Sequence, residues 1–174
     1  MSLLHPLSVR RVGDLKPGEL ARVRLFSGLA LVIAAQDERG QPKLVSLDRG
    51  PPNRQELHPP VFVSPGAARA DDALVIGADY VLVPGDLATA KHARDDGADA
   101  NGALMLTPGG VYLRVHGMQD GFDTALLLDW AGGKLLTWEP DQERAFLVPS
   151  WSLVRRPEHP AAPLDVLFSF EGAR

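Results

Sequence analysis

The stretch SGLALVIAAQDERGQPKLVSLD at 27–48 carries the strongest structural signal in the sequence. It holds two apolar runs, LALVIAAQ at 29–36 and KLVSLD at 43–48, on either side of the polar segment DERGQ at 37–41. Short runs rich in aliphatic and β-branched residues are typical of strands, and a glycine-containing segment between two such runs is typical of a hairpin turn. The stretch therefore predicts two antiparallel strands joined by a tight connection.

A second stretch, GGVYLRVHGMQDGFDTALLLD at 109–129, is similar to the first when a single gap is allowed. Glycines then align with glycines and leucines with leucines: Gly28 with Gly110, Leu31 with Leu113, Gly40 with Gly121, and Leu47-Asp48 with Leu128-Asp129. Similarity at a fixed offset predicts an internal duplication. A meander built from glycine turns and Leu/Val strands gives such a match by chance, so both readings stay open.

Alternation with a period of two residues and turn residues dominate the rest of the sequence. The other runs that predict strands are 19–26, 60–64, 73–77, 79–84, 103–107, 111–116, 124–130, 134–139, 145–149, 151–155 and 164–170. The proline-containing segments at 49–60 and 156–163 cannot donate to a central ladder, so we expect loops or sheet edges there.

One segment, LATAKHARD at 87–95, has helical character, because Asp86 can cap its free amides and Gly97 can end it in a left-handed turn. We expect a mainly β, antiparallel protein with two similar small barrel or sheet half-units, or one larger sandwich, and one short surface helix near 87–95. The corresponding domains are an N-terminal β unit at 1–85, a helical, acidic connector at 86–102 and a C-terminal β unit at 103–174.

The connector contains KHARDDGADANG at 91–102, which gathers residue types that bind metal ions. His92 and Asp96 are four residues apart and would share a helix face, but two ligands do not make a site. A calcium loop needs a carboxylate first and a glutamate last, and those positions hold Gly97 and Pro108. We therefore expect no metal.

The chain has 174 residues and no cysteine, so disulfides, thiolate metal sites and cysteine nucleophiles are excluded. Its longest apolar run, 28–35, is too short to span a bilayer, and its first residues lack the order of a secretory signal. We expect a cytoplasmic protein without membrane association. Fourteen arginines against four lysines, with abundant alanine, glycine and proline, indicate a bacterial origin.

Charge is distributed unevenly around a net value of −4. Residues 1–60 hold nine basic and six acidic side chains, whereas residues 71–141 hold four basic and twelve acidic ones. Two solvated surfaces whose composition drifts along the chain account for this distribution. The sharper interpretation is complementary faces that meet within or between chains, which would fit a protein partner or a homo-oligomer. Nucleic-acid binding needs a concentrated basic surface and is not expected. An alternative of that class would use the basic residues near the N-terminus: Arg10, Arg11, Lys16, Arg22 and Arg24.

Alternation along VYLRVHG at 111–117 places Tyr112, Arg114 and His116 on one face of a strand. An arginine can pair with a carboxylate or phosphate, and a histidine titrates near neutral pH, so this row predicts a site for a small anionic ligand. The polar face of any antiparallel sheet has the same pattern. With Asp129, the row also gives an alternative, a small enzyme whose site is assembled in space.

Two further sets of residues attract attention. Trp130, Trp138 and Trp151 lie within 22 residues of one another, and we expect them to pack in the core. Asp48 and Asp129 are equivalent under the duplication and could form an acid–base pair. An aspartate before a turn needs no catalytic role, however.

Motifs for phosphate loops, dinucleotide binding and serine nucleophiles are absent from the sequence, and we expect no cofactor. The sequence predicts a non-catalytic bacterial binding or assembly module on a β scaffold, which recognises a protein partner or a small anionic ligand. The alternative is the small enzyme built around Tyr112, Arg114 and His116.

Overall fold

A computed structural model of the chain describes residues 8–25, 28–50, 59–93, 101–120, 122–137, 144–157, 159 and 162–171. These residues form strands β1 to β15 and three short 3-10 turns, η1 (Val12–Asp14), η2 (Pro65–Ala67) and η3 (Leu87–Thr89). The expectation of a mainly β, antiparallel fold is confirmed. No helical turn in this part of the chain has the length and apolar character needed to cross a membrane.

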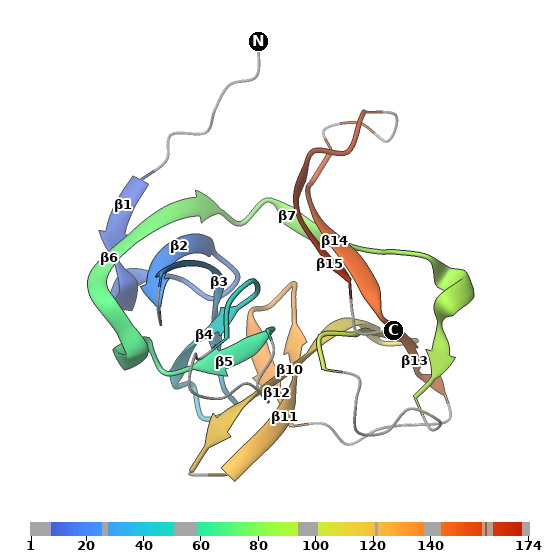
Figure 1. Cartoon of the computed structure of the whole chain (residues 1–174), viewed down its shortest axis with the longest axis horizontal. Helices are drawn as coiled ribbons and strands as arrows, with labels where there is room; N and C mark the ends of the chain where they lie inside the picture. The colour runs from blue at the N-terminus through green and yellow to red at the C-terminus, as the bar shows by residue number, and fades with distance from the viewer. Residues whose placement is uncertain are drawn as a thin grey trace.

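Six strands pair in a closed ring at the centre of the molecule (Figure 1). In order around the ring they are β3 (Gly28–Gln36), β4 (Pro42–Ser46), β5 (Val61–Val63), β10 (Gly110–Gln119), β11 (Phe122–Asp129) and β12 (Lys134–Leu136). β5 runs parallel to β10 and β12 runs parallel to β3, whereas the other neighbours are antiparallel. The stretch 27–48 thus contributes the expected hairpin, β3–β4, to this ring.

Aliphatic side chains from both halves of the sequence fill the inside of the ring. Alternate residues of β3 and β10 point inward, and Leu31, Ile33, Leu113 and Val115 are each 0% exposed. They belong to one cluster with Val45 and other residues of the neighbouring strands. Burying one such side chain stabilises the fold by about 1.5–3 kcal/mol. Because the cluster draws on both halves, these side chains are covered only when both halves are in place.

Further strands extend the ring on two sides (Figure 1). On the β3 side they are β2 (Leu20–Leu25), β6 (Ala68–Gly77) and β1 (Ser8–Arg11). On the β10 side they are β9 (Leu104–Thr107), β13 (Phe146–Val148) and β8 (Lys91–His92). Each extension buries a smaller apolar cluster of its own, so the outer faces of β3 and β10 are also covered in part.

Strands β1 to β7 and strands β8 to β14 pair in the same order. β1 pairs with β6 as β8 pairs with β13, and β2 lies between β6 and β3 as β9 lies between β13 and β10. The registers correspond as well: Val32 lies opposite Ser46, and Arg114 lies opposite Leu127. These are the residues that the alignment of the two stretches places at equivalent positions.

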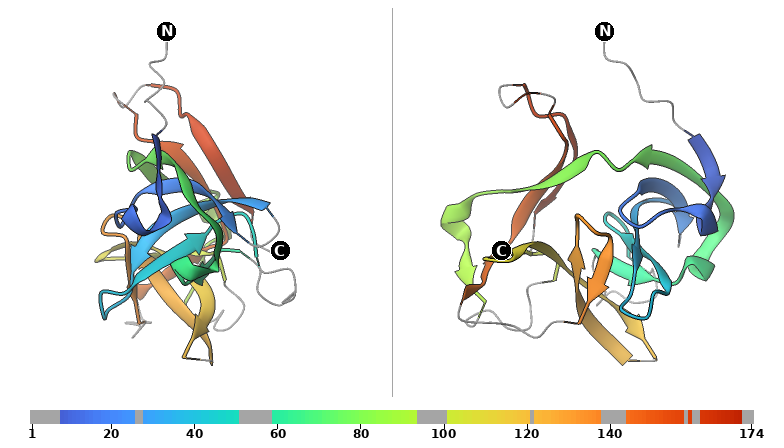
Figure 2. Two further views of the ribbon diagram at one scale, coloured as in Figure 1. Left: turned by 90° about the vertical axis from the view of Figure 1, so that its left-hand side faces the viewer. Right: turned by 180° about the vertical axis from the view of Figure 1, so that it is seen from behind.

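A separate three-stranded sheet, in the order β15–β14–β7, lies beside the ring (Figure 2). It consists of β7 (Tyr80–Pro84), β14 (Ser150–Arg155) and β15 (Val166–Glu171). Trp151 on β14 is 1% exposed, donates from Nε1 to the carbonyl of Gly102 at 2.7 Å and stacks on Phe170 at a centroid distance of 5.3 Å. The core position expected for Trp151 is confirmed, and its hydrogen bond explains how the indole is buried without an orphaned donor. Trp138 lies outside the described residues.

The surface helix expected near 87–95 is reduced to the single 3-10 turn η3. Asp86 does cap it, since its Oδ1 accepts from the amide of Ala88 at 2.9 Å. The segment then continues into β8, which pairs with β13. The backbone groups of Lys91 and His92 therefore face a neighbouring strand instead of the next turn of a helix. Leu87 is 60% exposed, so this segment has little apolar surface to hold a helix against the core.

The domain boundaries at 1–85, 86–102 and 103–174 stay a prediction. The ring nevertheless joins strands from the first and last of these segments, because β5 pairs with β10 and β12 pairs with β3.

The turn before β12 depends on a glycine. Gly133 has φ +59°, and its carbonyl accepts from the amide of Gln36 at 2.8 Å where β12 meets β3. A Cβ at this position would overlap the backbone of Pro17 and Gly18. Gly40 has a similar φ of +74° in the β3–β4 turn, but a Cβ there would meet nothing within 4 Å.

We therefore expect Gly40→Ala to lower the free energy of unfolding by about 1 kcal/mol, the cost of a positive φ alone. Gly133→Ala should cost about 1–3 kcal/mol more, because rigid backbone must move. Urea unfolding of both variants measures the difference. Equal losses would mean that the 17–18 turn does not pack against Gly133.

Candidate functional site

Strand β10 places the predicted row of polar residues on the outer face of the ring. Leu113 and Val115 point inward, and Tyr112, Arg114 and His116 alternate with them. Tyr112 and His116 are four residues apart, which is about 13 Å along a strand. A ligand that contacts all three side chains would therefore have to extend along the strand.

Arg114 is buried rather than displayed on the surface, with 7% of the residue exposed. Its backbone is also held, because its amide donates to the carbonyl of Ala103 at 3.0 Å and its carbonyl accepts from Gly102 at 2.9 Å. An anion arriving from solvent has little access to this guanidinium. The row therefore differs from the solvent-exposed face of a sheet, because its middle residue, Arg114, is buried.

His116 lies where β10 pairs with both β5 and β11, opposite Val61 and Ala125. Among the described residues its buried Nε2 has no hydrogen-bond partner. Burial lowers the pKa of His116 from its ordinary value of 6.5; the Asp123 carboxylate acts in the opposite direction, and the Arg114 guanidinium lowers the pKa further. The imidazole is therefore kept neutral near pH 7.

Tyr112 lines two cavities. The smaller, about 370 Å³, is bordered by Met105, Leu127, Thr137 and Arg144 among others. The larger, about 480 Å³, extends from the start of β10 to strand β7 and to the turn between β11 and β12. We call the larger cavity the β7 groove; its side chains with polar or aromatic character are Tyr80, Tyr112, Asp129, Trp130 and Arg156.

Two of these residues are fixed by contacts within the groove. Trp130 donates from Nε1 to the carbonyl of Tyr80 at 3.0 Å, which ties the β11–β12 turn to β7. Asp129 lies opposite Tyr112 in the β10–β11 register, and its Oδ1 accepts from the amide of Ala131 at 3.2 Å. The structure therefore brings together Tyr112 and Asp129 of the predicted set but not Arg114 or His116. Trp130 is half-buried at this groove and packs against the main core cluster.

Strand β7 is an edge strand, because it pairs with β14 and with no other described strand. The amides of Gly85 and Arg156 donate to the carbonyls of Ser150 and Asp79, which fixes the alternation of hydrogen bonds along this ladder. By that alternation, the peptide groups of Tyr80 and Leu82 point away from β14. The contact of the Tyr80 carbonyl with Trp130 agrees, so the free edge of β7 faces the groove. The sequence alone does not identify this edge, because the edge depends on which strands lie beside β7 in the folded chain.

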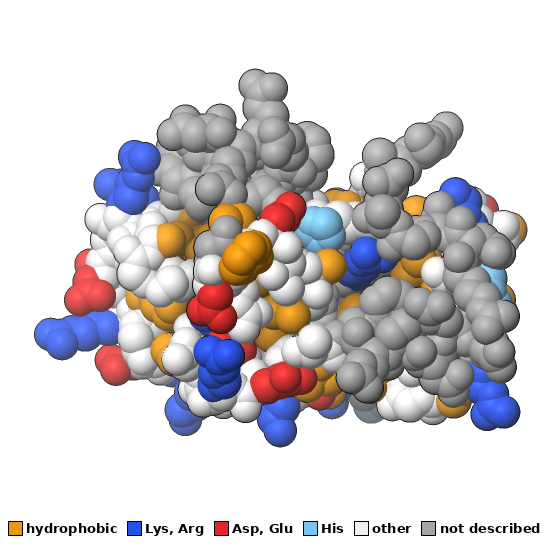
Figure 3. Space-filling view, turned by 90° about the horizontal axis from the view of Figure 1, so that it is seen from below, with side chains coloured by type: hydrophobic (Ala, Val, Ile, Leu, Met, Phe, Trp, Pro, Cys, Tyr) orange, Lys and Arg blue, Asp and Glu red, His pale blue; other side chains and the backbone are white. Residues whose placement is uncertain are grey.

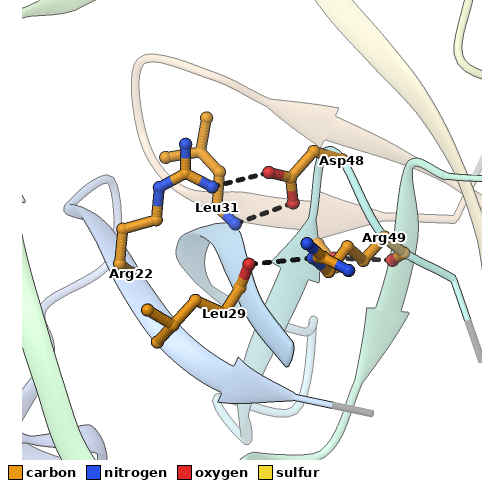
Figure 4. Close-up of polar contacts among 6 residues, drawn as sticks. Arg22, Leu29, Leu31, Asp48 and Arg49 are labelled. Carbon is orange, nitrogen blue, oxygen red and sulfur yellow. Dashed lines mark hydrogen bonds and ion pairs between the residues drawn. The ribbon is translucent and has the colours of Figure 1, made fainter. Parts of the chain in front are cut away.

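Asp48 is the counterpart of Asp129 in the first half, and both of its carboxylate oxygens contact other groups of the chain (Figure 4). Its Oδ2 pairs with Arg22 Nη1 at 2.6 Å, and its Oδ1 accepts from the amide of Leu31 at 2.8 Å. The neighbouring Arg49 donates from Nε to the carbonyl of Leu29 at 2.9 Å. Asp48 is not among the residues that line the β7 groove, so the acid–base pair considered for the two aspartates is not assembled there.

Two of the five basic residues near the N-terminus pair with carboxylates. Arg10 pairs with Glu19 at 2.7 Å, and Arg22 pairs with Asp48. On the face seen in Figure 3, acidic and basic side chains are interspersed. This arrangement gives no support to nucleic-acid binding, which needs unopposed positive charge.

A metal site is not found among the described residues, which contain no group of three or more His, Cys, Asp or Glu side chains placed to hold an ion. His92 instead packs edge-on against Phe146 at a centroid distance of 5.5 Å. Asp96 lies outside the described residues.

Comparison of the chain with protein-family models, with curated proteins and with solved structures finds no match. The β7 groove and its lining residues therefore carry the functional argument.

The depressed pKa of His116 makes stability depend on pH. The neutral imidazole is favoured in the folded state, so the unfolded chain binds a proton first as the pH falls below 6.5. The stabilisation is present above pH 6.5 and is lost as the pH falls through the folded-state pKa. We expect the free energy of unfolding to decrease between pH 7 and pH 5.5.

His116→Gln should reduce that decrease, and urea unfolding at several pH values measures it. His92→Gln serves as the matched control and should leave the pH dependence of the parent intact. The opposite ranking of the two variants would contradict the assignment to His116.

Proposed function

We propose that this chain is a non-catalytic binding module that holds an extended segment of a protein partner along strand β7. The observation that supports it is the free edge of β7, which borders a groove of about 480 Å³. An extended peptide can add to such an edge through main-chain hydrogen bonds, while neighbouring pockets select its side chains.

The edge is suited to a short partner segment. Leu82 offers both an amide and a carbonyl, and Tyr80 offers an amide, since its carbonyl accepts from Trp130. Pro84 has no amide to offer, so strand addition ends there. This limited edge also fits the way natural proteins guard unpaired strands against indiscriminate association.

Two alternatives from the sequence receive less support. A small anion would need an accessible cation, but Arg114 is buried and the groove presents the Asp129 carboxylate together with Arg156. The small enzyme needs Tyr112, Arg114, His116 and Asp129 to meet at one substrate, and the strand spacing separates His116 from the groove.

We extend the proposal to the origin and the assembly of the chain. The shared pairing order of β1–β7 and β8–β14 supports an internal duplication in a bacterial, cytoplasmic protein. Self-association is the second candidate, because β15 is the other edge of the three-stranded sheet. Leu164, just before β15, and Val166, its first residue, are 53% and 51% exposed. Light scattering at micromolar concentration would report a homo-oligomer of this kind.

Selection of random 12-residue peptides displayed on phage, with the purified protein as bait, tests the β7 proposal. We expect the enriched peptides to bind through their main chain, so Leu82→Pro should weaken a synthetic enriched peptide by about tenfold or more, through loss of one edge hydrogen bond and blocked approach. N-methylation at alternate peptide positions should do the same.

Ser169→Pro is the matched control, because it removes an outward amide from β15, the edge that does not line the groove. Binding should survive this change. An enriched peptide that binds Leu82→Pro as tightly as the parent protein would refute the proposal, and so would the absence of any enriched peptide.

A further inference from the structure

The two halves differ in the side chains that lie around their equivalent aspartates, Asp48 and Asp129. Asp48 follows β4 and Asp129 ends β11, and both lie at the same place in the shared pairing order. In the first half the chain supplies a cation to the aspartate, because Arg22 reaches Asp48 Oδ2 at 2.6 Å. The first half thus shows what kind of group this position of the fold accepts.

The second half has no basic residue at the corresponding positions. By the registers of β2–β3 and β9–β10, Leu104 corresponds to Arg22, and Leu104 is 0% exposed. Trp130 corresponds to Arg49, because each directly follows its aspartate in the alignment of the two stretches. Among the described residues no Lys, Arg or His nitrogen lies within ion-pair distance of Asp129, and its side chain accepts a hydrogen bond from the amide of Ala131.

Aromatic side chains line the groove that contains Asp129, whereas in the first half Arg22 pairs with Asp48. Tyr112 takes the place of Ala30 opposite the aspartate, and Tyr80 and Trp130 line the same groove. A half-buried carboxylate attracts a cation more strongly than an exposed one, and aromatic ring faces add to that attraction. Arg156 borders the groove without pairing with Asp129, so the carboxylate is left for a group from outside.

We infer that the partner segment inserts a basic side chain, arginine or lysine, into the β7 groove, where it pairs with Asp129 among Tyr80, Tyr112 and Trp130. This inference rests on the proposed peptide-binding function and names the chemistry of its ligand. The partner's guanidinium or ammonium takes the role toward Asp129 that Arg22 takes toward Asp48.

Parallel phage selections on the parent protein and on Asp129→Asn test the inference. Asparagine keeps an oxygen for the amide of Ala131, so the turn is preserved while the charge is removed. We expect peptides selected on the parent to share a basic residue at one position, and peptides selected on Asp129→Asn to lack that preference. Replacing the shared residue by citrulline or acetyl-lysine should weaken binding to the parent by about tenfold.

The same replacement should have little further effect on Asp129→Asn, because the two changes remove one interaction. Asp48→Asn is the matched control: it breaks the internal ion pair with Arg22 and should leave the basic preference intact. Peptides that require Leu82 but show no basic preference would overturn this inference and leave the proposed function standing. Failure to enrich any peptide would overturn both.

Discussion

The two parallel pairings, β5 with β10 and β12 with β3, are the constraint on which the rest of this structure depends. They convert two separate meanders into one ring and enclose a core to which both halves contribute. The ring also sets the position of the β11–β12 turn, in which Gly133 lies against Pro17 and Gly18. Without this closure, Asp129 and Trp130 would have no fixed relation to β7.

The ring also explains how the two halves can share a core and differ on their outer faces. Inward positions are held to the same aliphatic character, as Leu31 and Leu113 show, because a change there would disturb the shared core. Outward positions are less restricted. Where the first half has the small buried residues Ala30 and Val32, the second has Tyr112 and Arg114. Two halves with the same pairing order can in this way keep one core and differ on one outer face.

The three-stranded sheet has two edge strands, in addition to β1 and β8 at the two ends of the larger sheet. β14 is paired on both sides, whereas β7 and β15 each have one free side. The two edges differ in their surroundings. β7 ends at Pro84 and is linked to the ring by the hydrogen bond from Trp130. β15 projects from the molecule and has exposed aliphatic residues near its start (Figure 2). The proposed peptide site and the proposed surface for self-association therefore use opposite edges of one sheet.

The sequence by itself determined the elements whose evidence is local. Alternating apolar residues and glycine turns were enough for the β class, for the β3–β4 hairpin and for the inward and outward faces of β10. The helix near 87–95 was wrong because propensity and capping do not reveal that β13 offers Lys91 and His92 strand partners. Only the tertiary structure decided that Arg114 is buried, that β7 keeps a free edge and that Asp129 shares a groove with Tyr80. The physical reason is that periodicity records which face of a strand is covered, whereas the identity of its neighbours depends on how distant segments close the ring.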